Sequence, residues 1–219
     1  MKLIAFAVCS LGMLARGFAA ETPAAIAPTA RIDLFNGRDL SGWTFCLRSN
    51  AAPENTWTVT NGLIYCTGQP FGYMRTEKNY RDYKLTVEWR FVKVAPRADN
   101  TGLFVHVQSP DKVWPVCIEC QGQSHHHGDL ILMGTTVEAT RGSTNSLRVL
   151  RTAQPHNEKP VGDWNTYEVV CAGDALKVSV NGKLMNEAAG SSVSSGAIAL
   201  QSEGGEWEVR KVFLEPLPK

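Results

Sequence analysis

The sequence predicts an all-β protein in which two antiparallel sheets pack face to face. Short segments alternate between apolar and polar residues, with the period of two that a half-buried strand requires. Asn-Gly and Gly-Asp pairs, which favour tight turns, separate several of these segments. No segment after residue 20 has the apolar spacing of a helix longer than a turn or two. About ten to thirteen short strands at even spacing are typical of a β-sandwich.

The clearest strand is predicted at 83–91, where apolar residues on one face alternate with polar residues on the other. This pattern is typical of an antiparallel strand with one face in the core and one in solvent. Two hairpins turn at Asn-Gly pairs, and they join 55–59 to 62–66 and 176–180 to 183–185. The other strands are expected at 43–47, 102–108, 116–121, 130–133, 147–150, 164–171, 197–201 and 207–214.

The N-terminus predicts an exported protein. Residues 1–20 read as a signal peptide, because Lys2 precedes an apolar run that ends in the small residues Ala19 and Ala20. Residues 21–30 are rich in Pro and Ala and are expected to be a flexible lead-in, and 31–219 are expected to form a single domain. The expected location is therefore the periplasm or the extracellular space.

Two classes of partner are not expected. Lys and Arg number 22 against 21 Asp and Glu, so the charge gives no reason to predict nucleic-acid binding. No segment after residue 20 is apolar for long enough to span a bilayer.

The cysteines of the expected mature chain are odd in number, so at least one thiol must be free. Cys46 and Cys66 are the expected disulfide, because they fall in neighbouring predicted strands. Cys117 and Cys120 form a C-x-x-C but would face opposite sides of a strand, which argues against a local bridge. A single C-x-x-C also argues against a zinc ribbon.

The segment 116–121 is the candidate functional strand. Its even-numbered residues are apolar and suit a core, while Glu119 and Gln121 would lie side by side on the opposite face. Glu119 could be a site residue or a solvated surface residue. If the strand 102–108 is adjacent, His106 would lie on the same face and share a pocket with Glu119.

Other residues extend this candidate site. His125 and His127, with Glu119, could bind a divalent metal ion, or the histidine run could be a polar loop. Arg75 could contact a substrate or be a surface cation. Trp114 follows a turn-rich stretch beside Pro115, which makes it the best candidate of the six tryptophans to stack on a sugar ring.

Seven motifs, in order along residues 31–217, together resemble one family. They are Leu34–Trp43, Arg75–Arg90, Asn100–Phe104, Glu119-x-Gln121, Asp163–Glu168, Val180–Lys183 and Ile198–Gln201. The sequence is similar to the 3-keto-disaccharide hydrolase family, long known only as a domain of unknown function. The resemblance implies a concanavalin/lectin-like jelly-roll sandwich that acts on an oligosaccharide or glycoside.

The resemblance also implies a reaction. A ketone at sugar carbon 3 acidifies the proton at carbon 2; a base removes that proton, the group at carbon 1 leaves, and water then adds. Glu119 is the expected general base, with His106 as the second catalytic candidate. The expected substrate contacts are Arg75, Asn100, Gln121, Trp114 and Gln201. A bound divalent metal could stabilise the enediolate.

The chain departs from the family in two places. After Gln121, the residues Gly122-Gln123-Ser124-His125 stand where the family usually has an aliphatic residue and an aspartate, and the second departure follows Gln201. There Ser202-Glu203-Gly204 replaces the frequent Asp-His-Gly. These departures leave open a non-catalytic, lectin-like carbohydrate-binding module. A laminarinase-type retaining glycosidase would need a second carboxylate about 5 Å from Glu119, and the sequence offers no local candidate.

Overall fold

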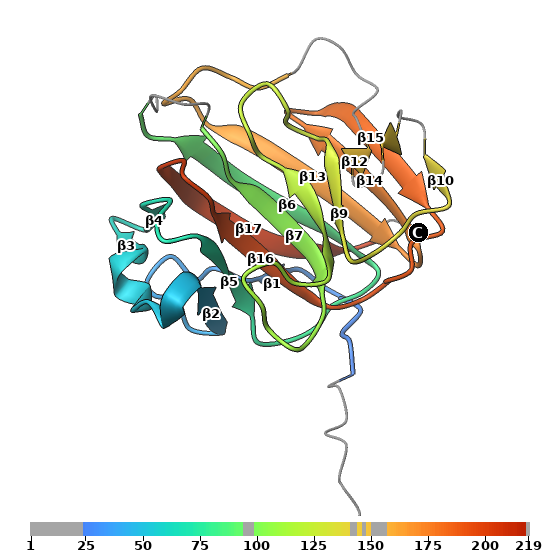
Figure 1. Ribbon diagram of the computed structural model, residues 1–219, viewed down its shortest axis with the longest axis horizontal. Helices are drawn as coiled ribbons and strands as arrows, with labels where there is room; N and C mark the ends of the chain where they lie inside the picture. Colours follow the sequence, from blue (N-terminus) through green and yellow to red (C-terminus); the bar gives the residue numbers. More distant parts are fainter. Residues whose placement is uncertain (1–23, 94–98, 141–143, 146–147, 150–156, 218–219) are drawn as a thin grey trace, which may run out of the picture.

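The computed structural model describes residues 24–93, 99–140, 144–145, 148–149 and 157–217 (Figure 1). Nearly all regular structure in these residues is β. One sheet contains β1 (Ile32–Asp33), β3 (Trp57–Thr60), β4 (Leu63–Cys66), β6 (Tyr83–Phe91), β10 (Ala139–Thr140), β13 (Asn165–Ala172), β14 (Ala175–Val180), β15 (Lys183–Ala189) and β17 (Trp207–Pro216). The other contains β2 (Trp43–Leu47), β5 (Gly72–Thr76), β7 (Gly102–Val107), β8 (Cys117–Gln121), β9 (Leu130–Met133), β11 (Thr144–Asn145), β12 (Arg148–Val149) and β16 (Ala197–Ser202). Two 3-10 turns, η1 (Arg48–Asn50) and η2 (Pro53–Asn55), are the only helical elements of the described ranges.

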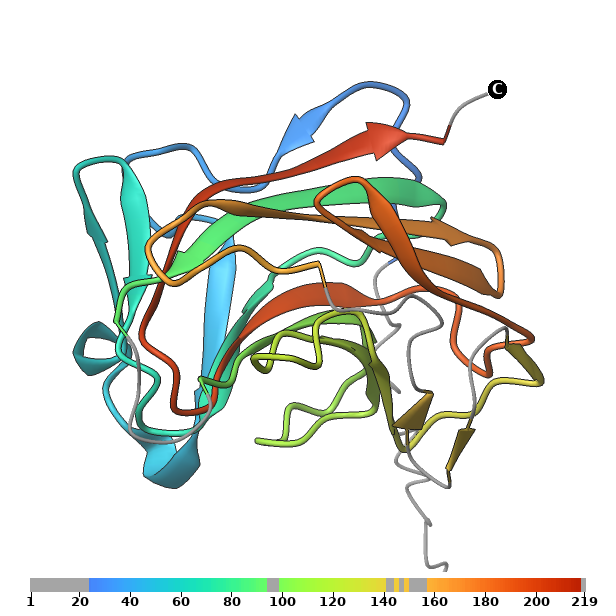
Figure 2. The same cartoon turned by 90° about the horizontal axis from the view of Figure 1, so that it is seen from above.

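The two sheets form the layers of a sandwich, as Figure 2 shows. The nine-stranded sheet has the order β10-β15-β14-β13-β6-β17-β4-β3, with β1 on β17. The eight-stranded sheet has the order β11-β12-β9-β8-β7-β16-β5-β2. Every named strand pair is antiparallel. The predicted all-β, concanavalin-like fold is confirmed.

The core lies between the two sheets and follows the predicted alternation. All five apolar residues of β6 are buried in one core cluster. Trp89, near the centre of that cluster, stacks on Tyr167 with ring centroids 6.1 Å apart and meets Trp207 edge-on at 6.2 Å. Ile118 and Cys120 close the core from the eight-stranded sheet. Each buried aromatic of this size removes apolar surface worth roughly 1.5–3 kcal/mol from water.

The predicted Cys46–Cys66 disulfide is wrong, and all five cysteines of the described chain are free thiols. Cys46 lies on β2 of the eight-stranded sheet, opposite Tyr73. Cys66 lies on β4 of the other sheet, paired with Trp57 and Trp207. The two strands are close in sequence, but they belong to different layers.

The N-terminal signal predicted at 1–20 lies outside the described residues. Of the lead-in, 24–30 are described, and Ile26 forms a parallel bridge with Tyr80. The described chain contains no helix with the length and apolar character needed to cross a membrane.

Candidate functional site

Glu119 lies on the outer face of the eight-stranded sheet, the face turned away from the nine-stranded sheet. Its strand neighbours are Phe104 on β7 and Ile131 on β9. The adjacent Ile118 and Cys120 point the other way, into the core. Only 4% of Glu119 is exposed, so it is not a solvated surface residue.

The absence of a side chain at Gly102 makes room for this carboxylate. Gly102 lies on β7 opposite Gln121. A Cβ atom at position 102 would lie 2.5 Å from Glu119 Oε1 and 3.0 Å from Gln201 Oε1. Glu119 therefore lies across β7 towards Gln201, a fully buried residue of β16.

Gln201 connects Glu119 to a second carboxylate. Its Nε2 donates a hydrogen bond to Glu203 Oε2 at 2.8 Å. The Asn100 amide acts to lower the pKa of Glu203, and the Gln201 amide acts to lower the pKa of Glu119. We call Asn100, Glu119, Gln201 and Glu203 the carboxylate cluster. Glu203 was not among the residues predicted for the site, and the one sequence signal for it is the departure from the family pattern after Gln201.

The pKa of Glu119 is raised from 4.5 to about 8, mainly by burial and also by the negative charge of Glu203. Arg148 and the Gln201 amide act against this shift. Burial also raises the pKa of Glu203, and the amides of Gln201 and Asn100 act against that shift. Glu119 is therefore mostly protonated near neutral pH, and its carboxyl can donate a proton.

Three acceptor oxygens of the cluster are buried without a hydrogen-bond partner among the described residues. They are Glu119 Oε1, Gln201 Oε1 and Asn100 Oδ1. A buried polar atom without a partner costs roughly 1–3 kcal/mol. One protonated carboxyl can donate to only one acceptor, so the cluster has capacity left for the hydroxyl groups of a ligand.

Gln121 and the outer-face residues beside the cluster complete this region. The Gln121 side chain accepts a hydrogen bond from the Gln123 amide at 2.8 Å. Beside the carboxylate cluster, the same face carries a group of buried apolar side chains that is separate from the main core. We call it the outer apolar cluster: Tyr73, Phe104, Val107, Cys117, Ala197 and Ala199.

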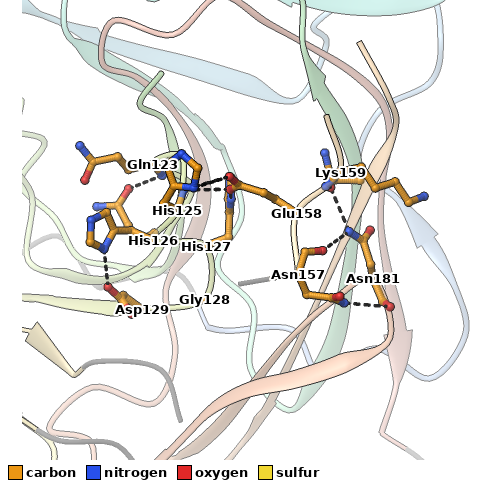
Figure 3. Close-up of polar contacts among 12 residues, drawn as sticks. Gln123, His125, His126, His127, Gly128, Asp129, Asn157, Glu158, Lys159 and Asn181 are labelled. Carbon is orange, nitrogen blue, oxygen red and sulfur yellow. Dashed lines mark hydrogen bonds and ion pairs between the residues drawn. The ribbon is translucent and has the colours of Figure 1, made fainter. Parts of the chain in front are cut away.

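The histidine run does not reach Glu119. His127 is buried on the core side, with its ring 5.0 Å from Trp89. Figure 3 shows His125 and His127 directed at Glu158, which pairs with both. The chain turns inward after β8, where Gly128 packs so closely on Met185 that a Cβ would lie 2.4 Å from it.

The expected metal site at His125, His127 and Glu119 is therefore not formed. The described ranges contain no group of three or more His, Cys, Asp or Glu side chains arranged to hold a metal ion. These residues do not fit a divalent metal, and no step of the chemistry below depends on one.

His106 is also separated from Glu119, contrary to expectation. The register of β7 with β16 shifts between Ala197 and Ala199, and His106 has φ of 56° at this bulge. An extra residue reverses the side-chain phase of a strand. His106 therefore faces the core, 6.1 Å from the Tyr83 ring, while its Nδ1 lies 3.1 Å from the Val193 carbonyl oxygen.

Arg75 lies on the outer face of β5. The pairs Arg75–Ala199, Ala199–Phe104 and Phe104–Glu119 place it three strands away from Glu119, a separation of about 14 Å at ordinary strand spacing. Its Nε and Nη2 donate to Asp111 Oδ1 and Oδ2 at 2.7 and 2.8 Å. Asp111 belongs to the β7–β8 loop, which also carries Trp114. Trp114 is 41% exposed and packs edge-on against Phe71 at 6.5 Å. The charge of Arg75 is thus already paired, whereas Trp114 presents an open aromatic surface.

Solved structures share the fold at low sequence identity. A protein from Parabacteroides distasonis ATCC 8503, provisionally assigned as a glycosyl hydrolase, has a TM-score of 0.62 and 19% identity, and the match covers 85% of this chain and 99% of that one. The carbohydrate-binding module CBM66 of Bacillus subtilis has a TM-score of 0.57 and 14% identity, covering 80% and 95%. The β-glucanase of Bacillus licheniformis has a TM-score of 0.55 and 14% identity, covering 86% and 99%.

The sequence itself gives a more specific match. No curated protein matches the chain. Residues 30–215, however, match the model of a family described as the 3-keto-alpha-glucoside-1,2-lyase-like domain. The match agrees with the motifs found along the sequence and spans nearly all of the β-sandwich. The chain therefore belongs to the family of the 3-keto-alpha-glucoside-1,2-lyase-like domain.

Proposed function

We propose that this chain is an exported enzyme that cleaves the glycosidic bond of 3-keto-glycosides. The observation that carries the proposal is Glu119, a buried carboxyl on the outer sheet face with an unpartnered oxygen. Structural carboxylates at such burial normally have charged or hydrogen-bonding partners for both oxygens. A carboxyl that lacks them, and whose pKa is raised into the neutral range, is suited to proton transfer.

Glu119 suits one step of the reaction especially well. Because burial keeps it protonated near neutral pH, it can donate a proton to the departing oxygen at carbon 1. This acid role replaces the base role expected from the sequence. The unpartnered oxygens of Asn100 and Gln201 would accept hydrogen bonds from sugar hydroxyls. Trp114 and Arg75 lie farther along the outer face and would contact a more distant part of the substrate.

The direct test is to incubate the purified protein with a 3-keto-disaccharide. We expect release of a 3-keto-monosaccharide or its unsaturated derivative. Glu119→Gln keeps the shape of the side chain and should lower turnover by about 10²–10⁴-fold, the usual contribution of general acid–base catalysis. Glu206→Gln is the matched control, because Glu206 pairs with Tyr65 and Lys93 away from the cluster. An absence of turnover by the wild-type protein would overturn the proposal.

Two alternatives make different predictions. The fold likeness to CBM66 supports a binding module, which would bind glycans without product and be unaffected by Glu119→Gln. Glu203 is a second carboxyl group near Glu119, and a retaining glycosidase would use two such groups about 5 Å apart. That enzyme would hydrolyse ordinary β-glucans at least as well as their 3-keto forms.

A further inference from the structure

We propose that Glu203 and Glu119 work as a pair that holds one proton, with Glu203 as the base and Glu119 as the acid. This inference rests on the proposed function and deepens it. Its geometric basis is the Gln201 side chain, which donates a hydrogen bond to Glu203 Oε2 at 2.8 Å and meets the Glu119 carboxyl over Gly102.

The surroundings of the pair favour one negative charge rather than two. Glu119 is 4% exposed and Glu203 is half-buried. Two neighbouring carboxylates in a site of low polarity repel each other, so one of them retains its proton. Arg148 contributes a positive charge from β12, but it also lies 3.6 Å from the buried Asp129. Its charge is therefore shared.

The proton belongs on Glu119. Glu119 Oε1 has no hydrogen-bond partner in the described chain, and the shared charge of Arg148 only partly offsets its burial. Glu203 accepts a hydrogen bond from Gln201 Nε2 at 2.8 Å, lies beside the Asn100 amide, and retains contact with solvent. Hydrogen bonds of this kind stabilise the ionised form. The raised pKa of Glu119 is consistent with this assignment.

The pair accounts for both halves of the reaction. In the first half, Glu203 takes the proton from carbon 2, the bond between carbon 1 and the leaving oxygen breaks, and Glu119 gives its proton to that oxygen. In the second half, Glu119 takes a proton from water as the water oxygen bonds to carbon 1, and Glu203 returns its proton to carbon 2. Both carboxyls end as they began, and the net reaction is hydrolysis.

The two roles can be separated with an activated substrate. A nitrophenyl 3-keto-glycoside has a leaving group that needs no acid. Glu119→Gln should therefore lose about 10²–10⁴-fold on a 3-keto-disaccharide but keep most of its activity on the nitrophenyl substrate. Glu203→Gln should lose about the same factor on both substrates and should also lose exchange of the carbon 2 proton with deuterated water. The reverse pattern, or wild-type exchange in Glu203→Gln, would overturn the assignment.

A substrate-free measurement keeps the inference testable if the proposed function fails. Infrared titration of the full-length protein should detect the protonated carboxyl of Glu119 near neutral pH, and Glu119→Gln should remove that signal. In Glu203→Gln, loss of the neighbouring charge should lower the pKa of Glu119 towards its ordinary value, while Glu206→Gln should leave it unchanged. If the pKa of Glu119 is unchanged in Glu203→Gln, the two carboxyl groups do not share a proton, and this conclusion holds for any substrate. A lowered pKa without turnover of any 3-keto-glycoside would refute only the proposed function.

Discussion

Glu119 and His106 lie on neighbouring strands, are almost completely buried, and are both neutral near pH 7, yet their surroundings differ. The His106 ring packs on Tyr83 and one of its nitrogens meets a carbonyl oxygen, so its burial serves the core. Glu119 faces away from the core and has an oxygen without a partner. Burial lowers the pKa of His106 to about 4 and raises that of Glu119 to about 8. His106 Nε2 is also buried without a partner in the described chain, so neither burial nor an unpartnered atom alone marks a functional residue. Glu119 differs because it faces away from the core and lies beside Gln201 and a second carboxyl group, that of Glu203.

The largest expected effect on stability comes from Glu119. Its folded-state pKa lies above the ordinary 4.5, so the folded state disfavours the charged form and stability falls as pH rises from about 4.5 to 8. Full ionisation costs about 5 kcal/mol. Glu119→Gln should therefore be more stable than the wild type at pH 9 by roughly that amount, with little difference at pH 4. Urea unfolding at both pH values tests this, and a gain that does not depend on pH would contradict it.

His106 should produce the opposite pH dependence. Its folded-state pKa lies below the ordinary 6.5, so the free energy of unfolding should fall by about 3 kcal/mol as pH drops from 6.5 to 4. His106→Asn should remove this slope, since asparagine tolerates the positive φ at the bulge. His125→Asn is the matched control, because His125 also has a positive φ but is exposed. If the free energy of unfolding of His106→Asn still falls as the pH drops, another group causes the pH dependence.

The smallest effect is expected at the pair of Arg75 and Asp111. Its side chains are 19% and 36% exposed, and partly exposed ion pairs typically contribute about 0.2–1 kcal/mol. A double-mutant cycle with Arg75→Gln and Asp111→Asn should give a coupling energy within that range. If Arg75 also contacts the substrate, Arg75→Gln should raise KM for a 3-keto-disaccharide more than Asp111→Asn does. Equal KM values in the two variants would leave Arg75 a purely structural residue.

Regular alternation made much of the fold predictable. The strand 83–91 coincides with β6, and its apolar face forms the core as expected. The strand β5 was missed, because Pro70 and Gly72 interrupt the pattern around it. Its pairing with β2 and β16 comes from contacts distant in sequence.

The site was predictable only where its strands keep a regular period of two. Glu119, Gln121 and Gln201 share the outer face because ordinary strands keep a period of two. His106 does not, because one extra residue at a bulge reverses that period, and the sequence gives no sign of the bulge. Glu203 joins Glu119 across β7 and β16, a contact that strand order alone creates.

Gly102 implies a constraint on how this protein can evolve. The place a methyl group would take at position 102 is already occupied by the carboxyl of Glu119 and the amide of Gln201. A larger residue there would have to displace the ends of both side chains, or occur with a shorter residue at 119 such as aspartate, which would withdraw the acid group by one methylene. Positions 102 and 119 should therefore be inherited as a unit, and a relative with a side chain at 102 should have lost or rebuilt its chemistry.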